Sequence, residues 1–260
     1  PRRDIPAKVD GSAKFAADTR LPNMTYASVL RSPVPGGSLI SIDDSIARSL
    51  PGVIDVVKLP AASVTNMLGE MRASEAVAVV ADSYWTANNA VQTLEIKWSE
   101  TEYDSVSSDS IYEQFDRDIS ARIDRNTDRI EGEVDQAFSG AARVIDADYH
   151  VPFLAHTCME PLNATADVRS DSAEIWVGCQ NPLGFRRVVA EFLELDTEKV
   201  TLHNHIMGGG FGRKSQQDFV IQAALISKSV GRPVQLIWSR EEDVRQDFYR
   251  PAVQSRFKAA

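Results

Sequence analysis

The segment 207–214 is the part of the sequence best suited to bind a ligand. It reads Met-Gly-Gly-Gly-Phe-Gly-Arg-Lys, with four glycines in five positions between an expected strand and an expected helix. Glycine allows positive φ and a close approach of the backbone to a ligand. Successive amide N–H groups before a helix suit an anion or a metal-bound oxygen, and Arg213 and Lys214 add positive charge. The pattern predicts a binding loop; a tight turn without a ligand is the alternative.

Two known nucleotide-binding patterns are partly similar to this loop. A P-loop requires Gly-x-x-x-x-Gly-Lys-Ser, and Lys214-Ser215 supplies its ending, but Arg213 stands at the last glycine and Phe211 is bulky. A dinucleotide fingerprint fails because its third glycine would also fall at Arg213. A P-loop-like phosphotransferase or ATPase, and a non-catalytic interaction domain, therefore remain the alternative functions.

The same loop resembles that of a known family. Residues 207–212 followed by a basic residue are similar to the molybdopterin loop of the xanthine dehydrogenase and aldehyde oxidase family. Gln180 lies 31 residues before Phe211, the separation that this family shows between its molybdenum-site glutamine and its loop phenylalanine. The amino-acid sequence of the matching segments is most similar to β subunits of isoquinoline 1-oxidoreductase-like and membrane-associated aldehyde dehydrogenases. Further segments match in the family's order: 7–13, 31–33, 53–57, 77–82, 155–161, 231–234 and 239–243.

The resemblance implies a site in which the protein binds molybdenum through the pterin and adds hydrogen bonds around the metal. It implies molybdopterin, in the cytosine dinucleotide form, as the cofactor. Gln180 would be the catalytic residue, bonding an oxygen ligand of the metal through its amide. The backbone amides of Phe211 and Gly212 would face the same ligands, which makes Gln180 and Phe211 the metal-site residues. The implied cofactor-binding residues are Gly208, Gly209, Gly210, Phe211, Gly212 and Arg213.

Two departures from the family pattern limit what this chain is expected to do. Ser215 stands where animal xanthine dehydrogenases have a substrate-binding glutamate, so purine recognition is in doubt. The family's catalytic base lies in Gly-x-Gly-Glu, and the Gly-Glu pairs at 69–70 and 132–133 lack the preceding glycine. We therefore expect part of a larger molybdenum-dependent subunit, inactive in isolation, that oxidises an aldehyde or N-heterocycle with water-derived oxygen.

Composition narrows the possible partners. The net charge of -9 argues against nucleic acid. The sequence contains only two cysteines, Cys158 and Cys179, whereas an iron–sulfur cluster normally takes four thiolates. Clusters are therefore expected on a partner iron–sulfur subunit, with a cytochrome or a flavin as further acceptor and a small molecule as substrate. No apolar run is long enough for a transmembrane segment. A cytoplasmic and a periplasmic location both remain open.

Other constellations of reactive side chains are weaker. His203 and His205 share one face of an expected strand and could imitate a zinc set with a cysteine, but metal-ligand spacing is missing. His156 and Cys158 suggest thiol catalysis, but no third group is evident that would orient the pair.

The elements that must position these residues predict an α+β protein in three parts. Residues 1–104 resemble the family's a/b hammerhead domain, 105–131 form a charged linker with a short helix near 111–115, and 132–260 form the first part of the molybdenum-cofactor-binding domain. Asn181 should cap a helix, and Ser215 with Asp218 should form a capping box on another that ends at Gly231. The other expected elements are strands at 24–30, 53–59, 77–81, 95–98, 200–206 and 234–238, and helices at 44–50 and over 87–94.

Overall fold

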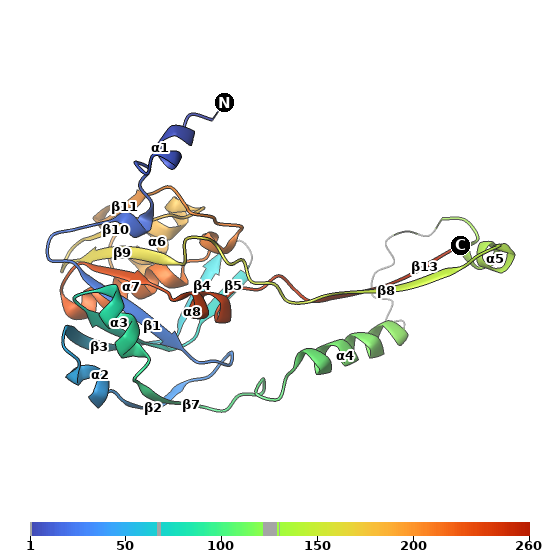
Figure 1. Cartoon of the computed structure of the whole chain (residues 1–260), viewed down its shortest axis with the longest axis horizontal. Helices are drawn as coiled ribbons and strands as arrows, with labels where there is room; N and C mark the ends of the chain where they lie inside the picture. Colours follow the sequence, from blue (N-terminus) through green and yellow to red (C-terminus); the bar gives the residue numbers. More distant parts are fainter. Residues whose placement is uncertain (1, 67–68, 122–128, 130) are drawn as a thin grey trace. The chain divides into compact units, whose positions relative to one another are not determined.

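The computed structural model describes residues 2–66, 69–121, 129 and 131–260. Its mixture of helices and strands confirms the α+β class (Figure 1). The helices are α1 Ile5–Val9, α2 Ser45–Ser49, α3 Tyr84–Val91, α4 Ser108–Ser120, α5 Val134–Gly140, α6 Pro182–Leu193, α7 Asp218–Val230 and α8 Arg240–Arg245. The strands are β1 Thr25–Arg31, β2 Leu39–Asp43, β3 Val53–Leu59, β4 Ala62–Asn66, β5 Gly69–Ala73, β6 Ala76–Ala81, β7 Glu95–Trp98, β8 Ile145–Val151, β9 Asn163–Val168, β10 Ala173–Val177, β11 Val200–Asn204, β12 Val234–Ile237 and β13 Val253–Ala259.

The chain divides into two compact units, residues 1–101 with 156–248, and residues 102–155 with 249–260. The first unit is built on a seven-stranded sheet in the order β11-β10-β9-β12-β1-β6-β3. The sheet contains strands from both halves of the sequence, joined where β1 pairs in parallel with β12. The boundaries expected at 104 and 131 stay a prediction, and residues 122–128 and 130 of the expected linker lie outside the described residues.

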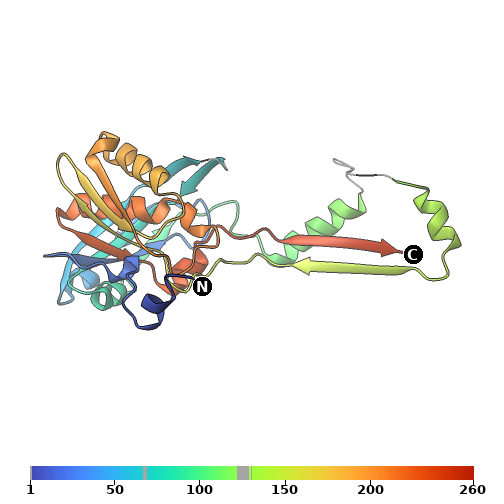
Figure 2. The ribbon, with the colours of Figure 1, turned by 90° about the horizontal axis from the view of Figure 1, so that it is seen from above.

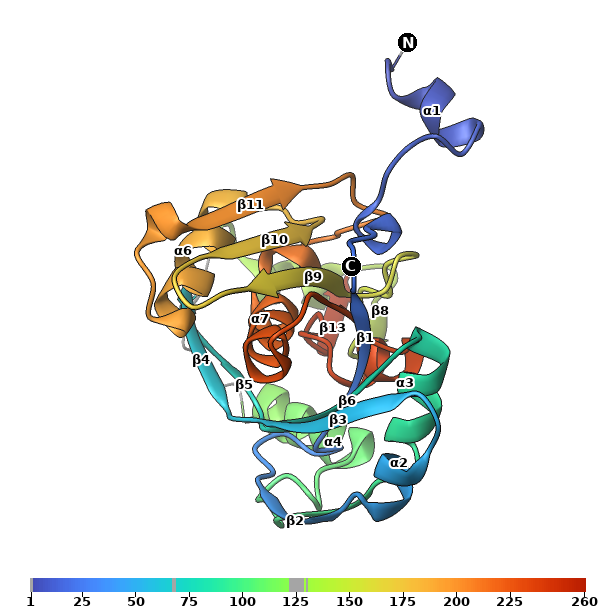
Figure 3. The ribbon, with the colours of Figure 1, turned by 90° about the vertical axis from the view of Figure 1, so that its left-hand side faces the viewer.

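Strand β6 shows why the middle of this sheet forms where it does. All six of its residues are apolar and buried, the pattern of a strand covered on both faces. Alternate residues Ala76, Ala78 and Val80 face a core shared with α6 and α7. Val77 and Val79 face a second core with α2 and α3, so helices lie on both sides of the sheet (Figure 3).

The two helices that flank the glycine loop follow the sequence signals except at one end. The Asn181 side chain accepts a hydrogen bond from the Gly184 N–H, which confirms the predicted cap of α6. Gly231 ends α7 with a φ of 64°, also as predicted. The predicted capping box of Ser215 and Asp218 was wrong. Helix α7 begins at Asp218, after a 3₁₀ turn, and the Asp218 carboxylate binds the buried Arg213 instead.

The second unit contains α4, α5 and the antiparallel pair β8–β13, whose strands lie side by side in Figure 2. Helix α4 is longer than the expected helix at 111–115. One face of the strand pair is polar and meets α4, because His150 stacks on Tyr112 and Arg256 binds Asp116. The other face carries apolar side chains that are exposed in the described residues: Ile145, Tyr149, Val151, Val253 and Phe257. Among the described helices, none has the length and apolar character needed to cross a bilayer.

A buried carboxyl on α8 makes the stability of the fold depend on pH. Glu242 is 1% exposed and accepts a hydrogen bond from the Arg31 N–H at 2.9 Å. Burial outweighs this bond and raises the pKa of Glu242 from 4.5 to about 7. Between these two values the folded chain holds a proton that the unfolded chain has released, so this group's contribution to stability falls as pH rises.

We therefore expect Glu242→Gln to flatten the pH dependence of the free energy of unfolding between pH 4.5 and about 7. The slope removed is at most about 1.4 kcal/mol per pH unit, the linkage of one proton. Urea unfolding at several pH values measures it. Glu191→Gln, on an exposed position of α6, is the control and should keep the wild-type slope. A Glu242→Gln profile parallel to wild type would contradict the prediction.

Candidate functional site

The glycine loop leaves β11 and turns through several left-handed conformations. Gly209 has a φ of 104° and Gly212 a φ of 97°, which only glycine adopts easily. Phe211 has a φ of 49°, uncommon for a bulky residue, and its side chain is 74% exposed. An exposed phenylalanine held in a strained conformation points to a functional constraint on the loop rather than a packing one.

This backbone leaves a row of unused donors. Within the described part of the chain, the N–H groups of Gly209, Gly210 and Phe211 donate to no protein acceptor. Unpaired successive amides in a loop of this kind form a concave site for anionic oxygen. The loop's donor chemistry thus agrees with the predicted binding role.

Gln180, which follows β10, meets the loop through its side chain. Its Oε1 accepts the Gly212 N–H at 3.0 Å, and its own backbone N–H donates to the Lys214 carbonyl at 3.0 Å. Because Oε1 faces a donor, the Gln180 side-chain NH₂ is the group left free for a ligand. The structure brings Gln180 and the loop together as expected. One detail was wrong: the Gly212 amide is bound to Gln180 and does not face outward.

Glu160 supports the loop from behind, and its role was not predicted. Its carboxylate accepts the Gly208 N–H at 2.9 Å, the Ala17 N–H at 3.2 Å and the Lys214 Nζ at 2.7 Å. Burial alone would raise the pKa of Glu160, but the bonds from Lys214 and Gly208 outweigh it and the pKa is lowered. Glu160 is therefore a fixed anion that holds both ends of the glycine run.

Arg213 also supports the loop. The prediction that its positive charge lies on the ligand side was wrong. Its side chain is 1% exposed, and its two terminal nitrogens bind Asp218 at 2.9 and 2.8 Å. Its Nε lies 3.0 Å from Asp247 Oδ1, at an angle outside hydrogen-bond geometry. The guanidinium also lies over the rings of Trp238 and Phe248. Its positive charge is therefore paired with carboxylates inside the protein.

The same holds for Lys214, which decides against a phosphate-binding loop. Its side chain is 1% exposed and its ammonium group is bound to Glu160. A P-loop lysine must reach the nucleotide phosphates, and this one is turned into the protein. The Ser215 hydroxyl is also engaged within the protein, since it donates to the Gly212 carbonyl at 2.6 Å.

The cysteines and histidines form no second reactive site in the described part of the chain. Burial raises the pKa of Cys158, and it raises that of Cys179 to about 11, so both stay as weakly reactive thiols near neutral pH. His203 pairs with Glu174 at 3.0 Å rather than with a cysteine. No group of metal-ligating side chains is assembled among the described residues.

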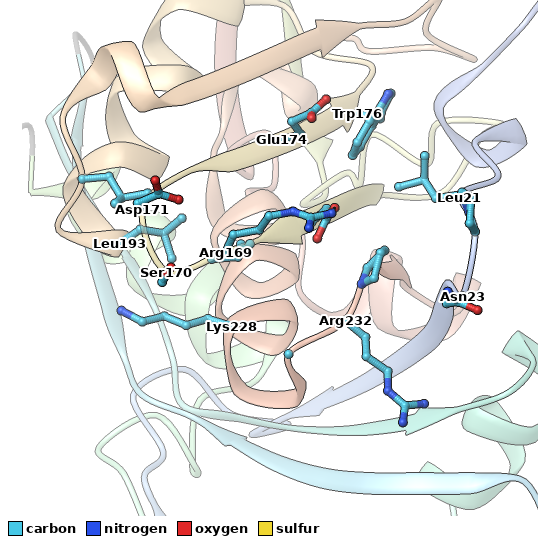
Figure 4. A pocket seen from close by; sticks show the side chains of 16 residues that line it. Leu21, Asn23, Arg169, Ser170, Asp171, Glu174, Trp176, Leu193, Lys228 and Arg232 are labelled. Carbon is cyan, nitrogen blue, oxygen red and sulfur yellow. The ribbon is translucent and has the colours of Figure 1, made fainter.

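A pocket of about 1290 Å³ lies away from the loop (Figure 4). It is lined where β9 ends and β10 and β12 begin, whereas Gln180 and the glycine loop follow the other ends of β10 and β11. Charges of both signs line it, among them Arg169, Lys228 and Glu174 (Figure 4). None of the predicted site residues contributes to it.

Comparison with known proteins decides the family. The model of the molybdopterin cofactor-binding domain matches residues 115–260, and that of the aldehyde oxidase and xanthine dehydrogenase a/b hammerhead domain matches residues 10–102. The chain belongs to the molybdopterin cofactor-binding family. Membership confirms the resemblance, the two kinds of domain and molybdopterin with molybdenum as the cofactor.

The relatives of this molybdopterin cofactor-binding chain belong to oxidoreductases. It is 32% identical to the β subunit of isoquinoline 1-oxidoreductase of Brevundimonas diminuta, over 100% of this chain and 32% of that protein. It is 31% identical to the large molybdopterin subunit of nicotinate dehydrogenase of Eubacterium barkeri, over 90% of this chain and 59% of that protein. The chain thus spans only part of the length of each relative, about a third of the first.

Solved structures support the fold of the molybdopterin cofactor-binding chain. The aldehyde oxidoreductase from Desulfovibrio gigas matches with a TM-score of 0.71 and 19% identity, over 99% of this chain and 32% of that one. The quinoline 2-oxidoreductase from Pseudomonas putida 86 matches with a TM-score of 0.68 and 22% identity, over 93% and 34%. The roles assigned to Gln180 and to the residues of the loop stay predictions.

Proposed function

We propose that this chain is the segment of a molybdenum hydroxylase subunit that holds the metal end of molybdopterin, in an enzyme that oxidises an aldehyde or an N-heterocycle. One observation carries the proposal. The free amides of Gly209, Gly210 and Phe211 lie on the same loop that fixes the Gln180 side chain through the Gly212 N–H. These three amides and the Gln180 side-chain NH₂ are four donors that fit the anionic oxygens that a pterin-bound molybdenum centre presents.

Each part of the chain has a definite task in this proposal. When bound, the cofactor supplies the two-electron redox chemistry that no side chain provides. The loop amides and the Gln180 NH₂ bind and orient it, and they stabilise negative charge where it develops during reaction. Glu160, Lys214 and Arg213 keep the loop rigid, so that these donors need not reorganise during the reaction.

The finer points of the proposal rest on resemblance and on cysteine count. We propose the cytosine dinucleotide form of the cofactor. The electrons would leave through an iron–sulfur subunit, since the chain's two cysteines, Cys158 and Cys179, are both buried thiols. A cytochrome or a flavin would accept them next. The substrate class follows the names of the relatives, which include an isoquinoline and a nicotinate enzyme.

Gln180→Ala is the direct test. In the intact enzyme we expect turnover to fall by about tenfold or more, because one preorganised donor is lost where charge develops. The fold should persist, since Gln180 is exposed. Turnover per bound molybdenum is the measurement, and Gln92→Ala, at an exposed glutamine after α3, is the control. Wild-type turnover at full molybdenum occupancy would remove Gln180 from the site.

A further inference from the structure

His156 lies beside the glycine loop with one ring nitrogen unused. Its Nε2 is 3.9 Å from the position that a Cβ on Gly212 would occupy. The side chain is 14% exposed, so it is accessible to a ligand but largely enclosed by protein. In the described part of the chain, Nε2 has no hydrogen-bond partner, whereas Nδ1 has one. The free nitrogen is the one turned toward the loop.

Asp247 determines which ring nitrogen carries the proton. The Nδ1 of His156 lies 3.0 and 3.1 Å from the two carboxylate oxygens of Asp247. The same carboxylate accepts the His156 backbone N–H and the Phe248 N–H, and pairs with Arg213. A carboxylate in this setting only accepts, so Nδ1 must donate, and a neutral ring then carries its lone pair on Nε2.

We propose that His156 Nε2 accepts a hydrogen bond from an N–H or O–H group of the ligand bound at the glycine loop, with Asp247 as the positioning residue. The loop amides and Gln180 offer donors, and His156 adds an acceptor beside them. The combination fits a ligand that carries anionic oxygen next to the ring N–H of a nitrogen heterocycle. The inference deepens the proposed function and rests on it.

Two substitutions separate this role from a structural one. His156→Asn keeps an amide where Nδ1 is and can still donate to Asp247, but it has no atom at the Nε2 position. His156→Gln reaches the Nε2 position with an amide oxygen but gives up the bond to Asp247. If His156 Nε2 accepts a hydrogen bond from the ligand, molybdenum per subunit of the intact enzyme should fall about tenfold in His156→Asn, as for one lost buried hydrogen bond. It should stay near wild type in His156→Gln.

The outcomes distinguish the inference from the function on which it rests. If the wild-type enzyme contains molybdenum and His156→Asn contains as much, the role of His156 alone is overturned. A loss of molybdenum only in His156→Gln would overturn that role in the same way. A wild-type enzyme without molybdenum would overturn the proposed function. A measurement on the unaltered chain guards against variants that do not fold. Nitrogen-15 NMR above neutral pH should show the Nδ1–H tautomer for His156, and the opposite tautomer would reject the proposal.

Discussion

Replacing Arg213 with alanine is expected to lower the free energy of unfolding by about 3–5 kcal/mol, the usual loss when one partner of a buried ion pair is removed. Asp218 and Asp247 are 4% and 2% exposed, and each would lose its pairing with the guanidinium. The buried ring of Trp238 would also lose one of the two guanidinium groups that lie over it. Urea unfolding of the chain measures the difference.

A matched control and an opposite outcome make this test decisive. Arg187→Ala changes an exposed arginine on α6 and should shift the free energy of unfolding by no more than about 0.5 kcal/mol. A loss of that small size for Arg213→Ala would mean that Asp218 and Asp247 find other partners. It would also return Arg213 to the ligand side of the loop, where the sequence had placed its charge.

Gly210→Val is expected to remove most of the cofactor, with molybdenum per subunit of the intact enzyme reduced by about tenfold or more. A Cβ on Gly210 would stand 2.7 Å from Gln180 Oε1 and 3.1 Å from its Cδ. The Gln180 side chain would be forced away from the Gly212 N–H, and the branched side chain would crowd the free amides of the loop. Metal analysis of the purified enzyme measures the loss.

The control for this substitution is Gly140→Val, at the end of α5, where a Cβ meets nothing within 4 Å. It should leave the molybdenum content unchanged. Normal metal content in Gly210→Val would show that the loop is only a tight turn, which is the alternative that the sequence left open. The unfolding transition of each variant, measured in parallel, separates lost binding from lost folding.

The parts of the fold that could be predicted are those specified by neighbours in sequence. Strand β3 and the cap of α6 by Asn181 were found because a run of β-branched residues and a helix cap are both signals carried by a few neighbouring residues. Strand β9 was not found, since its segment Asn-Ala-Thr-Ala-Asp-Val lacks large alternating side chains. Its burial comes from β10, β12 and α7 packed around it.

The site shows the same division between local and distant information. The loop and Gln180 were found from glycine content and from the spacing shared with a family. The residues that support the loop were not found, because Glu160 binds Lys214 54 positions away and Asp247 binds His156 91 positions away. Asp218 was misassigned because its spacing from Ser215 fits a cap. A bidentate bond to a buried arginine outweighs a cap near the surface.

The parallel pairing of β1 with β12 has a consequence during protein synthesis. Its partners Thr25 and Val234 are far apart in the chain, so β1, β3 and β6 leave the ribosome long before β12 exists. Until then the edge of β1 opposite β6 has no partner strand, and Ala27 and Val29 lack the core that they share with Leu236. An open apolar edge on a nascent chain invites pairing with other chains. Strand β1 can therefore take its place in the middle of the sheet only after residue 237 has been synthesised.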